Sequence, residues 1–339
     1  MMKKTILALT IPALFATSAS AVEIYAAEDG SKVDLYGRLQ YEAGAFDYQK
    51  AKPNDAENFG GQGEVRLGVN VKYVLDDATA LIGKYEAQLA AESSQNDDIK
   101  TRYAWVGFRF MDTTDLTFGK SEAPRALLTD LTDTFDIFGA VVTDAGGFNR
   151  VDDQVRLSYA ENGVDLRAAY AFSDARKDDD NLRNQNTDGN RWGVAAGYTA
   201  PVGLGFVANY NQQDANNPTL GFEDKTSEWG VGTHYSIDGF YFAGLYGERD
   251  VKYVGSADGG NKFWELQAAY TVDQWTLLAD YANQKGRKAD SDSAEEKVDE
   301  YTFGVRYAFT PKTKVYGEYV LNEVSGKDDL YGVGLQYNF

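Results

Sequence analysis

The chain has 339 residues and a formal net charge of −19 at pH 7. Such an acidic chain lacks the basic surface that nucleic-acid binding needs, so nucleic acid is excluded as a partner. The absence of cysteine excludes a disulfide framework and thiolate chemistry. Glycine (34), tyrosine (23) and phenylalanine (18) are abundant. This composition favours strands and turns over helices, in which glycine costs about 1 kcal/mol relative to alanine.

Residues 1–21 have the three parts of a cleaved export signal. A Lys3-Lys4 pair is followed by a mostly apolar stretch, 5–17, and then by Ala19-Ser-Ala21, the small residues that signal peptidase accepts. The apolar stretch is shorter than the ~20 residues that a membrane-spanning helix needs. We therefore expect this segment to be removed. The exported domain, 22–339, would then carry 31 basic and 52 acidic residues, a net charge of −21.

The exported domain alternates apolar and polar residues along sixteen segments. In the first segment, Val33, Leu35 and Leu39 share one face, whereas Asp34 and Arg38 share the other. Period-two alternation of this kind predicts strands, because every second side chain of a strand lies on the same face. The segments are 33–46, 64–75, 79–89, 100–110, 115–119, 150–159, 164–172, 191–199, 204–212, 228–235, 240–248, 263–270, 275–282, 301–309, 313–321 and 331–339.

The pattern predicts a closed antiparallel β-barrel whose apolar face meets lipid and whose polar face lines water. Arg66 and Arg167 lie in the middle of segments, where the dry core of a soluble barrel or sandwich would not tolerate them unpaired. Aromatic residues such as Trp192 and Trp275 lie at segment ends, where the interfacial girdles of outer-membrane barrels occur. A soluble barrel or sandwich, with its apolar face inside, is the alternative.

The connections between the segments alternate in length, as they do in outer-membrane barrels. The long polar connections are 173–190, 213–226, 249–261 and 283–299. The tight turns are Asp76-Asp-Ala78, Glu161-Asn-Gly163, Pro201-Val-Gly203, Asp238-Gly239 and Thr310-Pro-Lys312. The connection 121–149 differs from both kinds because it is long and mostly apolar. Loops are usually polar and exposed, so we expect this one to fold into the barrel and bury its apolar side chains against the wall.

Several motifs closely resemble the enterobacterial general porins. The mature start of that family is matched by Val22-Glu-Ile-Tyr25 and Gly30-Ser-Lys-Val-Asp-Leu-Tyr-Gly-Arg38, and its end by Gly332-Val-Gly-Leu-Gln-Tyr-Asn-Phe339. Lys100-Thr-Arg102 and Leu116-Thr-Phe-Gly-Lys120 also match. The resemblance implies a 16-stranded barrel that assembles as a homotrimer, in which each protomer has its own pore, narrowed by an inward third loop.

The resemblance also implies an electrostatic constriction, in which basic residues on one wall face acids on the inward loop. All the basic positions lie on the polar faces of their segments, although ordinary solvated lumen charges are the alternative for any one of them. By motif they are Arg38, Arg66, Arg102 and Arg150. The acidic positions are Glu86, Asp133 and Asp136, the last because Ile137 occupies the family's usual place for the second acid.

An enzymatic function is not expected. The only histidine, His234, lies on a polar face without a nearby serine nucleophile motif, so a Ser-His-Asp triad has no support. There is no P-loop, no Rossmann glycine motif and no Cys/His metal cluster, so no cofactor is expected. The acidic runs 178–180 and 290–292 lack the EF-hand spacing, but they are candidates for divalent bridging to lipopolysaccharide.

The resemblance and the alternation together predict a general diffusion porin of the Gram-negative outer membrane. It would form a water-filled, weakly cation-preferring channel for small hydrophilic solutes and ions. One alternative is a substrate-specific channel, which an aromatic or basic ladder along one wall would indicate. The other is a plugged structural or adhesion barrel, whose long exposed loops would serve that role.

Overall fold

The computed structural model describes residues 21–46, 59–90, 99–143, 149–172, 189–217, 222–252, 258–287 and 295–339. The predicted export signal lies outside these ranges except for Ala21. The described residues contain one short helix, α1 (Ala126–Thr129), and seventeen strands. The strands are β1 (Val22–Ala26), β2 (Lys32–Ala45), β3 (Phe59–Asp76), β4 (Thr79–Ala90), β5 (Ile99–Phe110), β6 (Thr114–Glu122), β7 (Arg150–Glu161), β8 (Val164–Ala171), β9 (Arg191–Thr199), β10 (Leu204–Asn217), β11 (Phe222–Ile237), β12 (Phe240–Lys252), β13 (Gly259–Val272), β14 (Trp275–Arg287), β15 (Glu295–Thr310), β16 (Thr313–Asn322) and β17 (Leu330–Asn338).

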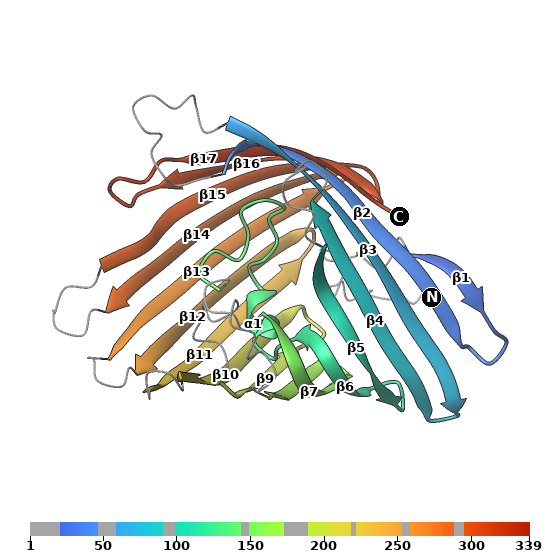
Figure 1. Cartoon of the computed structure of the whole chain (residues 1–339). Coiled ribbons are helices and arrows are strands. Elements are labelled where there is room, and N and C mark those ends of the chain that lie inside the picture. The colour runs from blue at the N-terminus through green and yellow to red at the C-terminus, as the bar shows by residue number, and fades with distance from the viewer. Residues whose placement is uncertain are drawn as a thin grey trace.

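Strands β2 to β17 form a closed antiparallel barrel (Figure 1). Each of these strands pairs with the next along the chain, and β17 pairs with β2, so that the sheet has no open edge between them. Closure satisfies every backbone group within the sheet, which a barrel in lipid requires. These sixteen strands correspond one to one to the sixteen alternating segments, and the predicted fold class is confirmed.

The first strand, β1, was not predicted. It pairs with residues Lys32–Leu35 of β2, whereas β17 pairs with Arg38–Ala45 of the same strand. The terminal residue Phe339 joins the two pairings, because its amide and carbonyl groups bond to those of Gly37 at 3.0 and 2.9 Å. A Cβ at residue 37 would overlap the ring of Phe339, so glycine is required there. Strand β1 and the C-terminal strand β17 therefore lie end to end along β2.

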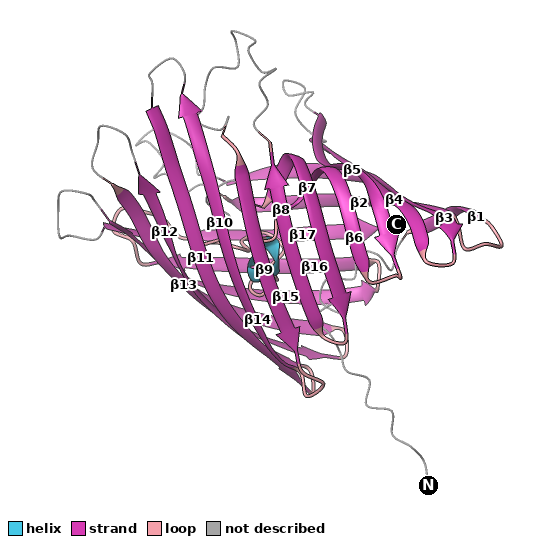
Figure 2. Ribbon diagram, turned by 90° about the horizontal axis from the view of Figure 1, so that it is seen from below, coloured by secondary structure: helices cyan, strands magenta, loops and turns pink. Residues whose placement is uncertain are grey.

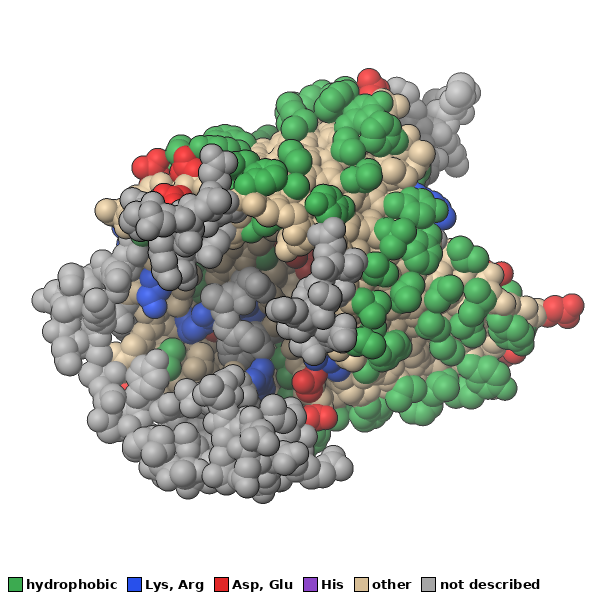
Figure 3. Space-filling view, turned by 45° about the horizontal axis from the view of Figure 1, so that its top comes forward, with side chains coloured by type: hydrophobic (Ala, Val, Ile, Leu, Met, Phe, Trp, Pro, Cys, Tyr) green, Lys and Arg blue, Asp and Glu red, His purple; other side chains and the backbone are tan. Residues whose placement is uncertain are grey.

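The apolar face of the barrel points outward. Along β12 and β13, Phe242 and Leu266 are 47% and 54% exposed, whereas Glu265 and Gln267 of the inner face are 1% and 4% exposed. Figure 3 shows hydrophobic side chains over the outer wall, and Lys and Arg side chains in the hollow. This arrangement overturns the soluble alternative. No helix in the described part of the chain is long and apolar enough to span a membrane.

Several strands continue beyond the segments predicted for them, at the end of the barrel that carries the long connections. Strand β10 ends at Asn217 and β14 at Arg287, where the alternation predicted ends at residues 212 and 282. Most of the added residues, 213–217 and 283–287, are polar in sequence. At the opposite end the turns are tight. Asn162-Gly163 and Asp238-Gly239 have positive φ at both residues, as type I′ hairpin turns need.

Residues 123–143, which follow β6, lie against the inner face of the barrel (Figures 1 and 2). Their apolar side chains, among them Leu128, Leu131 and Phe135, belong to a buried cluster with wall residues such as Tyr241 and Phe263. Two glycines of β11 leave room for this segment. A Cβ at Gly230 would overlap Leu128, and a Cβ at Gly232 would overlap Leu131. We call residues 123–143 the inner segment.

Candidate pore constriction

A buried ion cluster holds the base of the inner segment. Arg125, which precedes α1 and is fully buried, bonds to Glu228 of β11 through Nε and, at 3.1 Å, through Nη2. Arg249 of β12 also donates to Glu228, at 2.5 and 2.9 Å. Arg125 further donates to the carbonyl of Thr143 and, at 3.3 Å, to the amide oxygen of Asn149. One arginine therefore holds both ends of the segment against the wall.

A carboxylate of β16 holds the tip of the inner segment. Glu318 accepts hydrogen bonds from the amides of Asp136, Ile137 and Phe138 at 2.6, 3.0 and 2.9 Å. The side chain of Asp136 forms ion pairs with Arg306, at 2.7 Å, and with Lys314. Asp136, which was expected among the constriction acids, thus contacts β15 and β16, and its side chain is only 8% exposed.

A cavity of about 600 Å³ separates the inner segment from the opposite wall. Of the seven residues that the sequence predicted for the constriction, all but Asp136 line it. They are Arg38, Arg66, Arg102, Arg150, Glu86 and Asp133. The sequence did not predict the other charged or aromatic residues of the lining as part of the constriction. They are Tyr36, Lys84, Tyr103, Glu122, Asp130, Asp165, Arg167, Tyr198 and His234.

Neighbouring strands fix the basic side chains of the wall. Arg102 of β5 donates to Glu86 at 2.6 Å and to Gln88 at 2.9 Å. Glu86 also accepts a hydrogen bond of 2.7 Å from the hydroxyl of Tyr36. Arg66 pairs with Glu64 at 2.5 Å and lies directly opposite Arg38 in the register of β2 and β3. Arg102 and Arg66 are therefore each held in position by a carboxylate partner, Glu86 and Glu64 respectively.

A β-bulge increases the number of side chains that β5 directs into the cavity. Glu86 of β4 pairs with Tyr103 and Ala87 pairs with Thr101, so Arg102 is an extra residue on β5. Both Arg102 and Tyr103 consequently line the cavity. A bulge of this kind leaves no clear mark in the local sequence.

An aromatic pair encloses a lysine on the same wall. The ammonium of Lys84 lies 4.1 Å from the ring centre of Tyr103 and 5.4 Å from that of Tyr36. The guanidinium group of Arg150 lies 5.9 Å from the ring centre of Tyr103 as well. The position of Lys84 could have been found, because it is two residues from Glu86 and therefore on the same strand face.

The inner segment contributes Asp130 and Asp133 to the cavity. Burial between the segment and the wall raises the pKa of Asp130 to about 7, and repulsion by Glu122 acts in the same direction. Arg167 opposes this shift. Asp133 is exposed to the lumen and remains close to the backbone of the segment, since a Cβ at Gly139 would lie 2.6 Å from its Oδ1.

The charges of the lining nearly cancel. Six basic residues (Arg38, Arg66, Lys84, Arg102, Arg150 and Arg167) face five acidic ones (Glu86, Glu122, Asp130, Asp133 and Asp165). His234 is buried and lies 3.2 Å from the hydroxyl of Thr199. Within the described ranges, no group of three or more potential metal ligands could hold a metal ion. The arrangement is that of a charged, water-accessible passage narrowed by an internal segment.

Fold and site together define a transmembrane β-barrel channel. The family model described as "Gram-negative porin" matches residues 8–329. The chain belongs to this family.

Curated relatives align with this chain over all or nearly all of its length. Outer membrane porin F of Escherichia coli (strain K12) is 27% identical over 374 residues and covers 100% of both chains. Outer membrane porin PhoE of Salmonella typhimurium is 24% identical over 361 residues, with the same coverage. Outer membrane protein U of Vibrio parahaemolyticus is 24% identical and covers 98% of this chain and 94% of the relative.

Solved structures share the fold. Salmonella typhi OmpF, solved in complex with daunomycin, has a TM-score of 0.78 and 19% identity, over 94% of this chain and 100% of that chain. A loop deletion mutant of Vibrio cholerae OmpT has a TM-score of 0.75 and 20% identity, over 91% and 99% of the two chains. The protein is accordingly a general diffusion channel of the cell outer membrane, as the sequence predicted.

Proposed function

We propose that the channel is open, water-filled and weakly cation-preferring. The observation that carries the proposal is the balance of charge in the lining, six basic against five acidic residues, within an exported domain of net charge −21. A nearly neutral constriction rejects neither sign of ion strongly. The acidic excess elsewhere in the chain then decides the preference, because it enriches cations near the mouths of the pore.

Single-channel recording in planar bilayers tests this proposal. We expect ohmic open-channel currents and a small reversal potential of cationic sign in a salt gradient. Because mobile ions screen charges beyond ~8 Å at physiological ionic strength, the preference should weaken as salt rises. A preference that is independent of salt would place its origin in the constriction instead. Saturation by one solute would indicate a substrate-specific channel, and absence of current would indicate a plugged barrel.

We also propose that the protein assembles as a homotrimer. The support is its family and the outward apolar face; Vibrio cholerae OmpT has been solved in a trimer form. Unheated protein should migrate in detergent gels as a compact oligomer and shift to the monomer position after boiling. A single compact band at the monomer mass before heating, with a β-rich circular dichroism spectrum, would contradict the trimer and leave the barrel intact.

Two further proposals concern partners and chemistry. Divalent bridging to lipopolysaccharide by the acidic runs 178–180 and 290–292 is supported by their charge alone, because both runs lie outside the described residues. Loss of co-purifying lipopolysaccharide after chelation would support it. We propose no catalytic role, since His234 contacts Thr199 and the ring of Tyr241 rather than a serine. Hydrolysis of an ester or peptide that His234→Gln abolishes would contradict this.

A further inference from the structure

A second cavity adjoins the constriction. It has a volume of about 570 Å³, and its charged lining consists of Lys100, Arg102, Lys120 and Arg150; three uncharged polar residues complete it. Arg102 and Arg150 line both cavities, so the two are continuous parts of the lumen. We call this second cavity the vestibule pocket.

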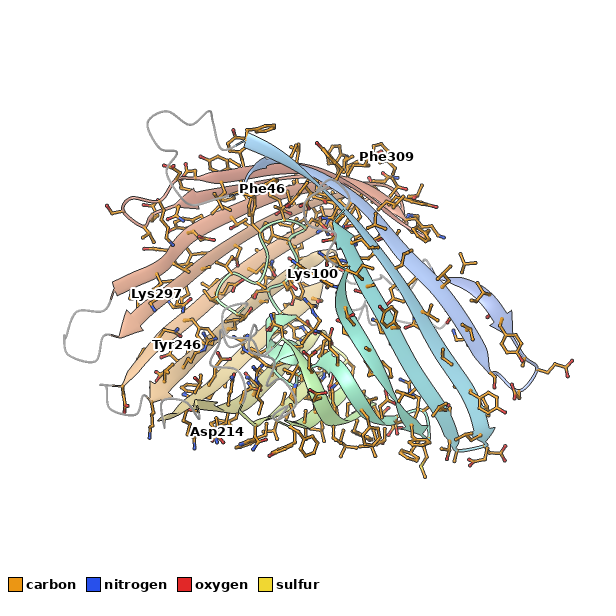
Figure 4. All side chains as sticks on the ribbon, viewed as in Figure 1. Phe46, Lys100, Asp214, Tyr246, Lys297 and Phe309 are labelled. Atoms are coloured by element: carbon orange, nitrogen blue, oxygen red, sulfur yellow. The ribbon has the colours of Figure 1, made fainter. Side chains whose placement is uncertain are left out.

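The vestibule pocket lies at the outer mouth of the pore. Lys100 is the second residue of β5 (Figure 4), at the end of that strand opposite its tight turn to β6. Arg150 is the first residue of β7, again away from the tight turn at 162–163. In outer-membrane barrels the short turns face the periplasm, so the pocket opens on the side of the cell exterior.

The pocket has an unusual charge for so acidic a chain. Among the residues that the structure describes, its lining holds four basic side chains and no carboxylate. The nearest neutralising contact of Lys120 is Asp152 at 2.9 Å, and that carboxylate is itself half exposed. Lys100 forms no ion pair with any residue that the structure describes. Because Arg102 pairs with Glu86 and Lys120 with Asp152, Lys100 and Arg150 are the two cations of the pocket that form no ion pair among the described residues.

The chemistry of the four side chains narrows the class of ligand. Arginine guanidinium groups bind phosphate oxygens through paired N–H donors, and lysine adds mobile point charges. A chloride ion can use one such contact at a time, whereas an anion with several phosphate oxygens can bridge β5, β6 and β7. The pocket faces the lumen, so its ligand comes from solution rather than from the lipid phase.

We propose that the vestibule pocket is a binding subsite for multivalent phosphate anions that enter the channel from outside. This subsite rests on the proposed open channel and adds one class of solute to it. Each contact lies in water of high dielectric and is weak, so binding should be weak, on the order of millimolar. Weak binding suits a channel, since a solute must enter the site and also leave it.

Pyrophosphate is the probe for this subsite. Sodium pyrophosphate, added in planar bilayers to the side of the long connections, should reduce the potassium current in a saturable way. Sodium sulfate and sodium chloride at equal ionic strength should reduce it less. In the double variant Lys100→Gln/Lys120→Gln, the half-blocking concentration should rise about tenfold, because two of the four charges are lost. Arg102 and Arg150 are left in place, since they also line the constriction.

Lys262→Gln is the matched control. Lys262 lies near the same end of the barrel, but it pairs with Glu248 at 3.0 Å and its side chain is 61% exposed. The half-blocking concentration of pyrophosphate for this variant should match that for the wild type. Equal block in the wild type and the double variant would overturn the proposal.

Calorimetry separates this inference from the proposed function. Protein in detergent free of lipopolysaccharide should bind pyrophosphate, and the double variant should bind it about tenfold more weakly. Vesicles that contain lipopolysaccharide should not compete, since its phosphates remain in the lipid phase. Binding without current would contradict the open channel alone. Current without pyrophosphate binding would contradict the subsite alone.

Discussion

At the scale of single residues, the charges of the constriction are held by identified partners and can be removed one at a time. Arg102 donates to Glu86 and Gln88, and Arg66 pairs with Glu64. Their positions are therefore fixed by side chains on the wall and do not depend on the inner segment.

We expect Arg66→Gln and Arg102→Gln to strengthen the cation preference, and Asp133→Asn to weaken it. Each shift should be modest, about 1 kcal/mol or less per charge, because the groups face water. Reversal potentials in a salt gradient measure the effect. Arg109→Gln is the control, since Arg109 is in β5 but pairs with Asp115 outside the cavity lining. If the three constriction variants match the control, these residues do not determine selectivity.

Asp130 should make the selectivity depend on pH near neutrality. Burial raises the pKa of this carboxyl to about 7, so it is mostly neutral below that pH and mostly charged above it. Between about pH 6 and about pH 8 the lining gains one negative charge, and the cation preference should rise. Asp130→Asn should remove that rise. If the cation preference of Asp130→Asn still rises fully with pH, another group causes the rise. The variant His234→Gln would then test the buried histidine.

At the scale of elements, the inner segment is held at two places by different chemistry. Its base depends on Arg125 and Glu228, which are both fully buried, and its tip depends on three amide donors to Glu318. Removal of one partner from a buried ion pair leaves an uncompensated charge, at a cost of about 3–5 kcal/mol. The barrel strands do not need this cluster for their own hydrogen bonds.

Arg125→Ala should therefore loosen the inner segment without unfolding the barrel. We expect the heat-modifiable band in detergent gels to persist, while single-channel currents become noisier and vary more in conductance. Arg109→Ala, which removes a part-buried ion pair outside the cavity lining, should leave both properties unchanged. Steady currents of wild-type conductance in Arg125→Ala would show that Glu318 and the apolar contacts suffice to hold the segment.

The same elements show what the sequence could predict. Alternation identified all sixteen barrel strands, because each must place apolar groups in lipid and polar groups in water. It missed β1, whose five residues are all exposed and pair only with β2. The position of Asp136 depends on its contacts with Arg306 and Lys314, about 170 residues away along the chain. Neither that contact nor the β5 bulge has a local signal.

At the scale of the whole molecule, the closed barrel brings the first described strand, β1, and the C-terminal residue together on β2. Val22 pairs with Leu35, and Phe339 bonds to Gly37, so only Tyr36 of β2 separates the two pairings. Ala21, the last residue of the predicted export signal, lines the constriction cavity.

We expect the chain to be cut after Ala21, because Ala19-Ser-Ala21 has the small residues that signal peptidase accepts, so that the mature protein begins at Val22. N-terminal sequencing of protein from outer membranes measures this directly. A cleavage-site variant, Ala19→Leu/Ala21→Leu, should retain the leader, because signal peptidase needs small residues at these two positions. A wild-type start at Met1 or Met2 would show that the segment is part of the mature protein.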